Sequence, residues 1–300
     1  MNSWLIFSLL GPMFWAMTNL LDAALRRHFI KDELALTWFM TLFRFVLAFI
    51  LFFIFGGVIE FNWVLVALFV AGMFWTLPLY FYFKAVEFEE PSRVALFTQM
   101  IPIFVLLIAS VFIGEELSRP QFFAFALILL GGAVAAFKRI NKKWHFSQAF
   151  PLIILAAFFW AVSDVMFKYF AAEFPDFTSA FLLYFIGAGL PAVLIIFFPK
   201  KSKEILKPYK TLSLKGWLLT TLSLSAGVAG SAFFTYALTL GKASLTAVII
   251  GLQPLFAFAL GWIFSLFIKE VEPESVKFTD IVFKLLALFL ILLGLFYLSV

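Results

Sequence analysis

The sequence predicts an all-α integral membrane protein with about ten transmembrane helices, arranged as two inverted repeats of five helices. The first observation is composition. Of 300 residues, 64% are hydrophobic and 13% are charged, whereas soluble chains are about half apolar and a quarter charged. The second is the length of the apolar runs, and the third is that motifs of the first half recur in the second. A soluble domain of this size cannot bury so much apolar surface, so we expect lipid to be its solvent.

The apolar runs follow one another with mostly short connections. They have the length of membrane helices and lack the alternation of a membrane β-barrel. The first run is too long for the core of a signal peptide, so we expect it to remain as a membrane helix. The longest breaks are the lysine-rich stretches 138–143 and 200–210. The expected spans are, in order, 4–25, 34–55, 63–83, 92–113, 121–137, 149–170, 178–198, 217–238, 244–268 and 281–298.

Three motifs of the first half recur in the same order in the second. Residues 14–19 (FWAMTN) match residues 159–164 (FWAVSD), and residues 127–131 and 290–294 both read LILLG. Between these motifs, residues 81–104 align without gaps on residues 233–256, sharing Phe, Ala, Ser, Ala, Pro and Phe at matched positions. We therefore predict an internal duplication, with repeats at residues 1–140 and 147–300.

An odd number of spans in each repeat places the two copies upside down relative to each other. Inverted repeats are typical of secondary transporters, whose substrate site lies near the bilayer midplane where the halves meet. Two similar halves of opposite orientation give inward-open and outward-open states by exchanging conformations. The duplication therefore predicts alternating access.

Several short motifs stand in the order found in one known family. They are Phe14-Trp15-Ala16, Arg44-Phe45, Pro102, Gly114-Glu115, Trp160-Ala161 with Lys168, and Pro254. With these motifs the chain resembles the drug/metabolite transporter superfamily, specifically its EamA-type ten-helix transporters. The resemblance implies a multi-pass efflux protein of the bacterial plasma (inner) membrane. Because members export amino acids, metabolites and toxic compounds, it implies a class of transporter and no particular cargo.

The second half departs from the family pattern at two places. Tyr184-Phe185 stands where an Arg-Phe pair would match Arg44-Phe45 of the first half. Lys269-Glu270 likewise stands where Gly114-Glu115 would predict Gly-Glu. These departures concern the substrate more than the fold.

Ionisable residues inside apolar spans are costly and mark candidate functional sites. Asp164 lies one turn after Trp160, and Asn19 is its counterpart in the first half. One interpretation is that both line the central cavity and bind a substrate ammonium group or take part in proton coupling. The other is that Asp164 pairs with Lys168, since residues four apart share a helix face.

Other polar and aromatic side chains are candidates for the same cavity. Gln99 and Gln253 lie near the span prolines, where a broken helix offers free backbone groups; each alternatively bonds a freed carbonyl or a neighbouring helix. Trp75, Tyr80, Tyr82 and Tyr236 form either a wall for a cationic or amphiphilic cargo or part of the interfacial aromatic belt. The expected substrate-binding residues are Trp15, Asn19, Tyr82, Gln99, Trp160, Asp164, Tyr236 and Gln253.

Two further features have structural interpretations. Arg44 either binds an anionic substrate or, as the family position implies, has a structural role. The small residues 225–231 predict close helix packing in preference to ligand binding.

The chain carries a net charge of +5, and its basic residues gather in the odd-numbered connections. The positive-inside rule then predicts both termini outside, whereas the family resemblance implies both inside, and the sequence leaves these open. The expected partners are a small-molecule substrate, the lipid bilayer and, where transport is coupled, protons. We expect no nucleic acid, no metal and no cofactor, and either a monomer or a weak dimer.

The function predicted is secondary transport, in the export direction, of a small metabolite such as an amino acid or an amphipathic compound. The alternative is a flippase for a lipid or lipid-linked substrate, which needs a lateral slot instead of an enclosed cavity. The sequence contains no phosphate-binding Walker loop. No Ser-His or His-Asp pair at helical spacing occurs in the spans, so we expect no enzyme.

Overall fold

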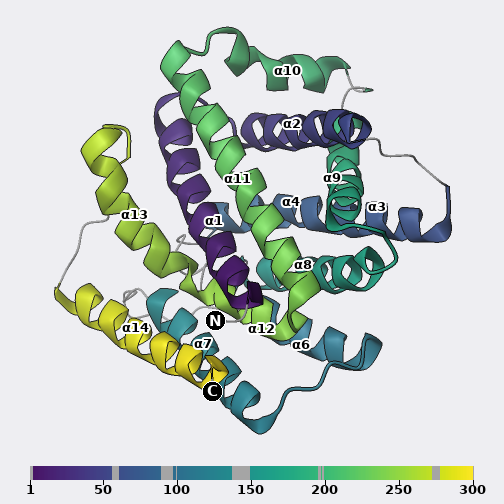
Figure 1. Ribbon diagram of the computed structural model, residues 1–300. Helices are drawn as coiled ribbons and strands as arrows, with labels where there is room; N and C mark the ends of the chain where they lie inside the picture. Colours follow the sequence, from purple (N-terminus) through teal and green to yellow (C-terminus); the bar gives the residue numbers. More distant parts are fainter. Residues whose placement is uncertain are drawn as a thin grey trace.

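The computed structural model describes residues 3–55, 61–88, 97–98, 100–136, 149–194, 197, 199–271 and 278–299, which fold into helices without a strand. The two chain ends lie at one end of the bundle (Figure 1). In chain order the helices are α1 (Ser3–His28), α2 (Glu33–Ile54), α3 (Trp63–Thr76), α4 (Pro78–Phe88), α6 (Met100–Phe112), α7 (Arg119–Ala136), α8 (Ala149–Ala171), α9 (Phe177–Leu194), α10 (Pro199–Lys210), α11 (Leu214–Leu240), α12 (Ala243–Val248), the 3₁₀ helix η2 (Ile249–Leu252), α13 (Gln253–Phe267) and α14 (Phe278–Ser299).

The described residues contain six helices long and apolar enough to cross a membrane, or seven if α12 to α13 is one bent span. This confirms an all-helical, multi-pass membrane protein. Three further apolar helices, 100–112, 119–134 and 285–297, are shorter. The predicted total of ten spans is therefore not reached by length and composition alone, partly because most of the residues 89–99 lie outside the described part of the chain.

Two predicted spans are interrupted, although residues 63–82 still count as one of the six helices above. The span 63–83 is interrupted at Leu77, where α3 ends and α4 begins with Pro78. The span 244–268 consists of α12, η2 and α13, with a bend of 43° between its two parts. Proline lacks the backbone N–H that an uninterrupted helix uses. Pro78 and Pro254 follow these breaks. The sequence predicted the break near Pro254.

The lysine-rich stretch 200–210, predicted as a long break between apolar spans, does separate α9 from α11, and it contains a helix that the sequence did not predict, α10. This helix lies across the end of the bundle opposite the termini (Figure 1). Ile205 and Tyr209, four residues apart, are buried, and the Tyr209 ring stacks on Phe39 of α2 with ring centroids 4.2 Å apart. Burial raises the pKa of Tyr209. Two anchoring side chains in a run of lysines are too weak a periodic signal to reveal a helix in the sequence.

The duplicated LILLG motifs pack against each other in α7 and α14. A Cβ atom at Gly131 would lie 2.6 Å from the Cγ1 atom of Ile291. A Cβ atom at Gly294 would likewise lie 2.6 Å from the Cγ1 atom of Ile128. Each glycine therefore receives the isoleucine of the other motif, a reciprocal contact of the kind a twofold axis produces. Because the later residue of one motif meets the earlier residue of the other, the two helices are antiparallel.

Equivalent hydrogen bonds also join the two halves along two other helix pairs. The single hydroxyl hydrogen of Thr18 in α1 is shared between the backbone oxygens of Phe14 in its own helix (3.1 Å) and Ser223 in α11 (3.4 Å). Ser163 of α8 donates to the backbone oxygen of Ala71 in α3 (2.7 Å). Thr18 and Ser163 hold the same position in the matched motifs FWAMTN and FWAVSD. The pairs α1–α11 and α3–α8 thus form the seam between residues 1–140 and residues 147–300, called here the first and second halves.

Candidate functional site

A buried cationic side chain lies at the seam. Arg44 of α2 is only 8% exposed, and its guanidinium carbon lies 4.8 Å from the centre of the Trp75 ring of α3. It packs on Gly227 of α11, where a Cβ atom would lie 2.8 Å from a terminal nitrogen of Arg44. The small residues 225–231 therefore allow close packing as predicted, and at Gly227 the group that packs against them is the Arg44 side chain. The Arg44 Nε has no hydrogen-bond partner among the described residues.

Polar and charged groups from both halves lie near the Arg44 guanidinium. It lies within electrostatic range of the Asp22 carboxylate of α1 and the Tyr184 hydroxyl of α9. Asp22 itself accepts a hydrogen bond from Ser223 of α11. A buried charge is tolerated when opposite charge and hydrogen bonds compensate it. Arg44 therefore belongs to a polar cluster built from α1, α2, α9 and α11.

Tyr184 connects this cluster to Asp164 of α8. Its hydroxyl lies 2.9 Å from the Ser163 hydroxyl, and because Ser163 donates to Ala71, Tyr184 is the donor to Ser163. Asp164 is 6% exposed and lies within electrostatic range of Tyr184. The Asp164 carboxylate forms neither a hydrogen bond nor an ion pair with any other residue in the described part of the chain.

The alternative interpretation of Asp164 as the partner of Lys168 is wrong. Lys168 instead forms an ion pair with Glu115 of the first half, with Nζ and Oε2 3.8 Å apart, and donates to the backbone oxygen of Gly241. Two residues four apart on a helix can pair, unless one of them has a partner elsewhere in the fold. Glu115, from the connection between α6 and α7, is that partner.

Two of the predicted aromatic residues gather beside Asp164. Trp160, one turn earlier on α8, donates its indole N–H to the backbone oxygen of Trp75 (2.9 Å). The ring of Tyr82 lies 6.0 Å from the ring of Trp160. These rings and Trp75 form one group on the α3–α8 side of the seam. Trp15 lies on the α1–α11 side, with its indole nitrogen 3.4 Å from the Ser231 hydroxyl.

The remaining predicted residues are distributed more widely. Asn19 is exposed and lies on the same face of α1 as Trp15 and Asp22, since it is four and three residues from them. Gln253 is half-buried at the start of α13, next to the helix break. Tyr236 packs against Phe7 and Phe177, about 13 Å along α11 from Gly227 at 1.5 Å per residue. Gln99 lies outside the described residues.

Two hollows lined by described residues lie elsewhere. One is beside Arg119 and Phe122 at the start of α7, and the other is an apolar groove between α6 and α8 that includes Phe104 and Phe158. Neither contains a predicted substrate-binding residue. A hollow at the seam stays a prediction.

Sequence reasoning did not anticipate three members of the polar cluster. Asp22, Ser163 and Tyr184 were not among the predicted substrate-binding residues. Tyr184 does carry a signal, because it stands at the second-half position that matches Arg44. The structure brings these two counterparts within electrostatic range of each other.

Comparisons with known proteins agree with this architecture. Residues 2–137 and residues 148–300 each match the model of the EamA-like transporter family. Chains of known structure that match number 28. One crystal structure superposes with a TM-score of 0.69 at 16% sequence identity, covering 96% of this chain and 93% of the other. At that identity the likeness shows the fold alone. No curated protein matches the chain.

Proposed function

Because this chain belongs to the EamA-like transporter family, whose model matches both of its halves, it is a membrane transporter of the drug/metabolite transporter superfamily, and we propose that it exports a small zwitterionic or amphipathic metabolite such as an amino acid. The cargo moves by alternating access along the seam between the halves. Transport is secondary, driven by the cargo gradient or by protons, with no nucleotide involved.

The single observation that carries this proposal is the pair of buried, incompletely partnered charges at the seam. Arg44 has an unpartnered Nε and Asp164 has no hydrogen bond within the described part of the chain, and Tyr184 lies within electrostatic range of both. Charges inside the membrane are expensive unless they are paired, and they face substrate pathways. A cargo with a carboxylate for Arg44 and an ammonium group for Asp164 satisfies both.

The aromatic group supports an amphipathic cargo. Trp75, Trp160 and Tyr82 lie next to these charges, and aromatic faces bind both ammonium groups and apolar side chains. Trp15 and Asn19 extend the site along α1, and Gln253 adds an amide at the break of the bent span. In this proposal Tyr236 and Gln99 belong to the path on either side of the binding position.

The mechanism rests on two inverted repeats, which we propose to be residues 1–140 and 147–300 with five spans each. The antiparallel packing of the matched LILLG motifs supports inversion. The equivalent hydrogen bonds of Thr18 and Ser163 support a seam with twofold symmetry. A bundle of this kind exposes its centre to either side by exchanging the conformations of its halves.

A lipid flippase is the weaker candidate. A flippase needs polar groups along a slot open to the bilayer, whereas Arg44, Asp164, Ser163 and Tyr184 are all less than a tenth exposed. The groove between α6 and α8 opens laterally, but its lining, which includes Phe104 and Phe158, offers no polar side chain for a headgroup.

The test is transport by the purified chain in liposomes. Labelled amino acids and amphipathic metabolites are offered with and without a pH gradient, and movement of a fluorescent phospholipid is measured in parallel. We expect saturable movement of a zwitterion and none of the lipid. The charge-removing variants Arg44→Gln and Asp164→Asn each lose a charged hydrogen bond worth about 1.5–3 kcal/mol, or roughly 10- to 100-fold in kcat/KM. Arg44→Lys, which keeps the charge, loses less.

Ser265→Ala, a half-buried position on α13 far along the chain from the cluster, is the matched control. Wild-type rates in both charge-removing variants would refute the binding site. Movement of the phospholipid in place of every zwitterion would favour the flippase. A rate that ignores the pH gradient would assign exchange or uniport instead of proton coupling.

A further inference from the structure

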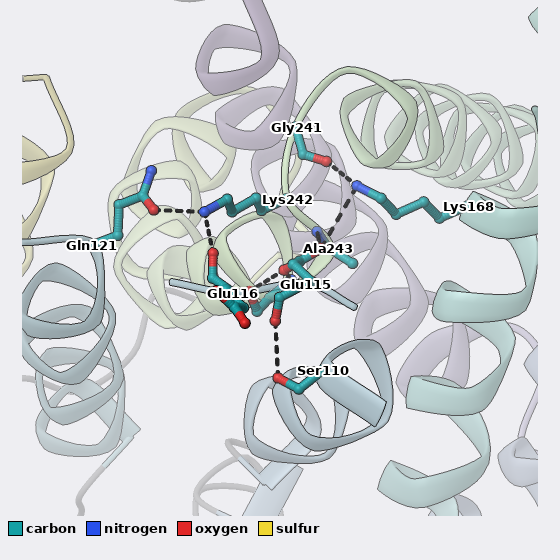
Figure 2. A network of polar contacts seen from close by, with 9 residues as sticks. Ser110, Glu115, Glu116, Gln121, Lys168, Gly241, Lys242 and Ala243 are labelled. Atoms are coloured by element: carbon teal, nitrogen blue, oxygen red, sulfur yellow. Dashed lines mark hydrogen bonds and ion pairs between the residues drawn. The ribbon is translucent and has the colours of Figure 1, made fainter. Parts of the chain in front are cut away.

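At the end of the bundle that carries both termini, a carboxylate of the first half holds the second half (Figure 2). Glu115 is 8% exposed, and its two oxygens accept hydrogen bonds from the backbone N–H groups of Ala243 (2.7 Å) and Ser244 (3.0 Å) and from the Ser244 hydroxyl. These groups begin α12, the first part of the bent span. The first N–H groups of a helix lack partners within it and favour negative charge.

Two lysines of the second half strengthen this connection. Lys168 of α8 makes its ion pair with the same carboxylate and also bonds Gly241, immediately before α12. Lys242 donates to the backbone oxygen of Glu116 and to the side-chain oxygen of Gln121, the latter at 2.8 Å. Figure 2 shows these contacts converging on the connection between α6 and α7. Both halves therefore contribute charge to one small network.

The local sequence places Glu115 there for a physical reason. Gly114 has a φ of +63°, a conformation that side-chain-bearing residues rarely adopt, and it turns the chain at the end of α6. The Ser110 hydroxyl then donates to the Glu115 carbonyl (3.0 Å), and the Glu115 N–H donates to that of Ala109 (3.1 Å). The Gly114-Glu115 motif thus presents a fixed carboxylate toward the other half.

The matching residue of the second half is used differently. Glu270 forms an ion pair with Lys215 at 2.6 Å, and both residues belong to the second half. Its other oxygen, Oε2, is buried without a partner among the described residues. Residues 91–92, which correspond to the start of α12, lie outside the described part of the chain. The described contacts therefore connect the halves through Glu115 and not through Glu270.

We propose that Glu115, Lys168 and Lys242 form a gate that closes the seam at the end carrying the termini and opens when the protein exposes its site on that side. This inference rests on the proposed transport function. A transporter that alternates must break whatever joins its halves at one end while the other end closes. Polar contacts at the end of a bundle suit that task, since water replaces each hydrogen bond when the network separates.

The chain contains no cysteine, so introduced cysteines are the only thiols. The first experiment joins Gln121→Cys to Lys242→Cys with a short, reducible bifunctional thiosulfonate in proteoliposomes. We expect transport to fall at least tenfold on cross-linking and to recover on reduction. The control pair Asp176→Cys and Ser179→Cys lies within the second half, at the start of α9, and its cross-linking leaves the rate within about twofold. Undiminished transport with the gate pair fully cross-linked would overturn the gate and leave the proposed function standing.

The second experiment needs no substrate. Spin labels at Glu116→Cys and Glu173→Cys, exposed positions in the first and second halves, report the distance across the gate. We expect Glu115→Gln and Lys168→Gln to add a longer distance, and the matched Glu270→Gln to leave the distribution at this end unchanged. Unchanged distances in both gate variants, with only a lower melting temperature, would show a static brace and refute the gate. If the wild type moves no substrate, the transport proposal fails, and this measurement still decides whether the network opens.

Discussion

The closest helix approach at the candidate site predicts that Gly72→Ala destabilises the protein and distorts the site. A Cβ atom at Gly72 of α3 would lie 2.0 Å from the Tyr184 carbonyl oxygen and 2.5 Å from the Ala188 nitrogen of α9. Both neighbours are backbone atoms, so no side chain can rotate away. The two helices must separate by more than an ångström, and this moves Tyr184 relative to Ser163 and Arg44.

The size of the effect follows from what that separation changes. Overpacking costs about 1–3 kcal/mol. It also strains the 2.6 Å hydrogen bond from Thr76 to the Ala188 oxygen, which contributes about 0.5–1.5 kcal/mol. The higher helix propensity of alanine offsets about 1 kcal/mol. The net loss of about 0.5–3.5 kcal/mol corresponds to a melting temperature lower by about 1–14 °C.

The assay compares melting temperatures of purified variants in one detergent by loss of the monodisperse gel-filtration peak. Gly261→Ala is the matched control, since its Cβ would meet only Leu20, at an ordinary contact distance of 3.6 Å. We expect the control to melt at or slightly above the wild-type temperature. If Gly72→Ala melts within 1 °C of Gly261→Ala, the inferred contact between α3 and α9 is wrong.

Two more predictions concern hydrogen bonds. Ser163→Ala should reduce transport and stability more than its counterpart Thr18→Ala. Ser163 donates to the backbone at 2.7 Å and also accepts a hydrogen bond from Tyr184, whereas the bond of Thr18 across the seam is 3.4 Å long. Equal effects of the two substitutions in both assays would contradict this prediction. Asp176 caps α9 through Ser179, and these bonds lower the pKa of Asp176, so Asp176→Ala should cost about 1 kcal/mol at neutral pH. The Asp176 contribution is complete above the ordinary pKa near 3.9 and disappears as the pH falls through the lowered value. The melting temperatures of wild type and variant should therefore approach each other as the pH falls below the ordinary value. A difference that stays constant would show that the carboxylate charge is irrelevant.

The sequence by itself was sufficient for the membrane class and the duplication. Apolar runs and repeated motifs are properties of contiguous residues, and the broken span before Pro254 follows from the missing N–H of proline. It also identified Asp164, Trp160 and Tyr82 as candidates for one site, because polar and aromatic groups inside apolar helices are conspicuous. In the structure the Tyr82 ring lies beside that of Trp160, one turn before Asp164 on α8, and substrate binding by these residues stays a prediction.

Only the tertiary structure decided the partners of the charged groups. Lys168 pairs with Glu115, although Asp164 is the carboxylate four residues away on its own helix. Arg44 packs on Gly227 and lies within electrostatic range of Tyr184, residues far along the chain. From the sequence alone, a lysine could pair with any of several carboxylates, depending on how the helices pack. The close approaches at Gly72 and Gly227 select one packing among these, and they depend on which helices become neighbours, which no local pattern of hydrophobicity encodes.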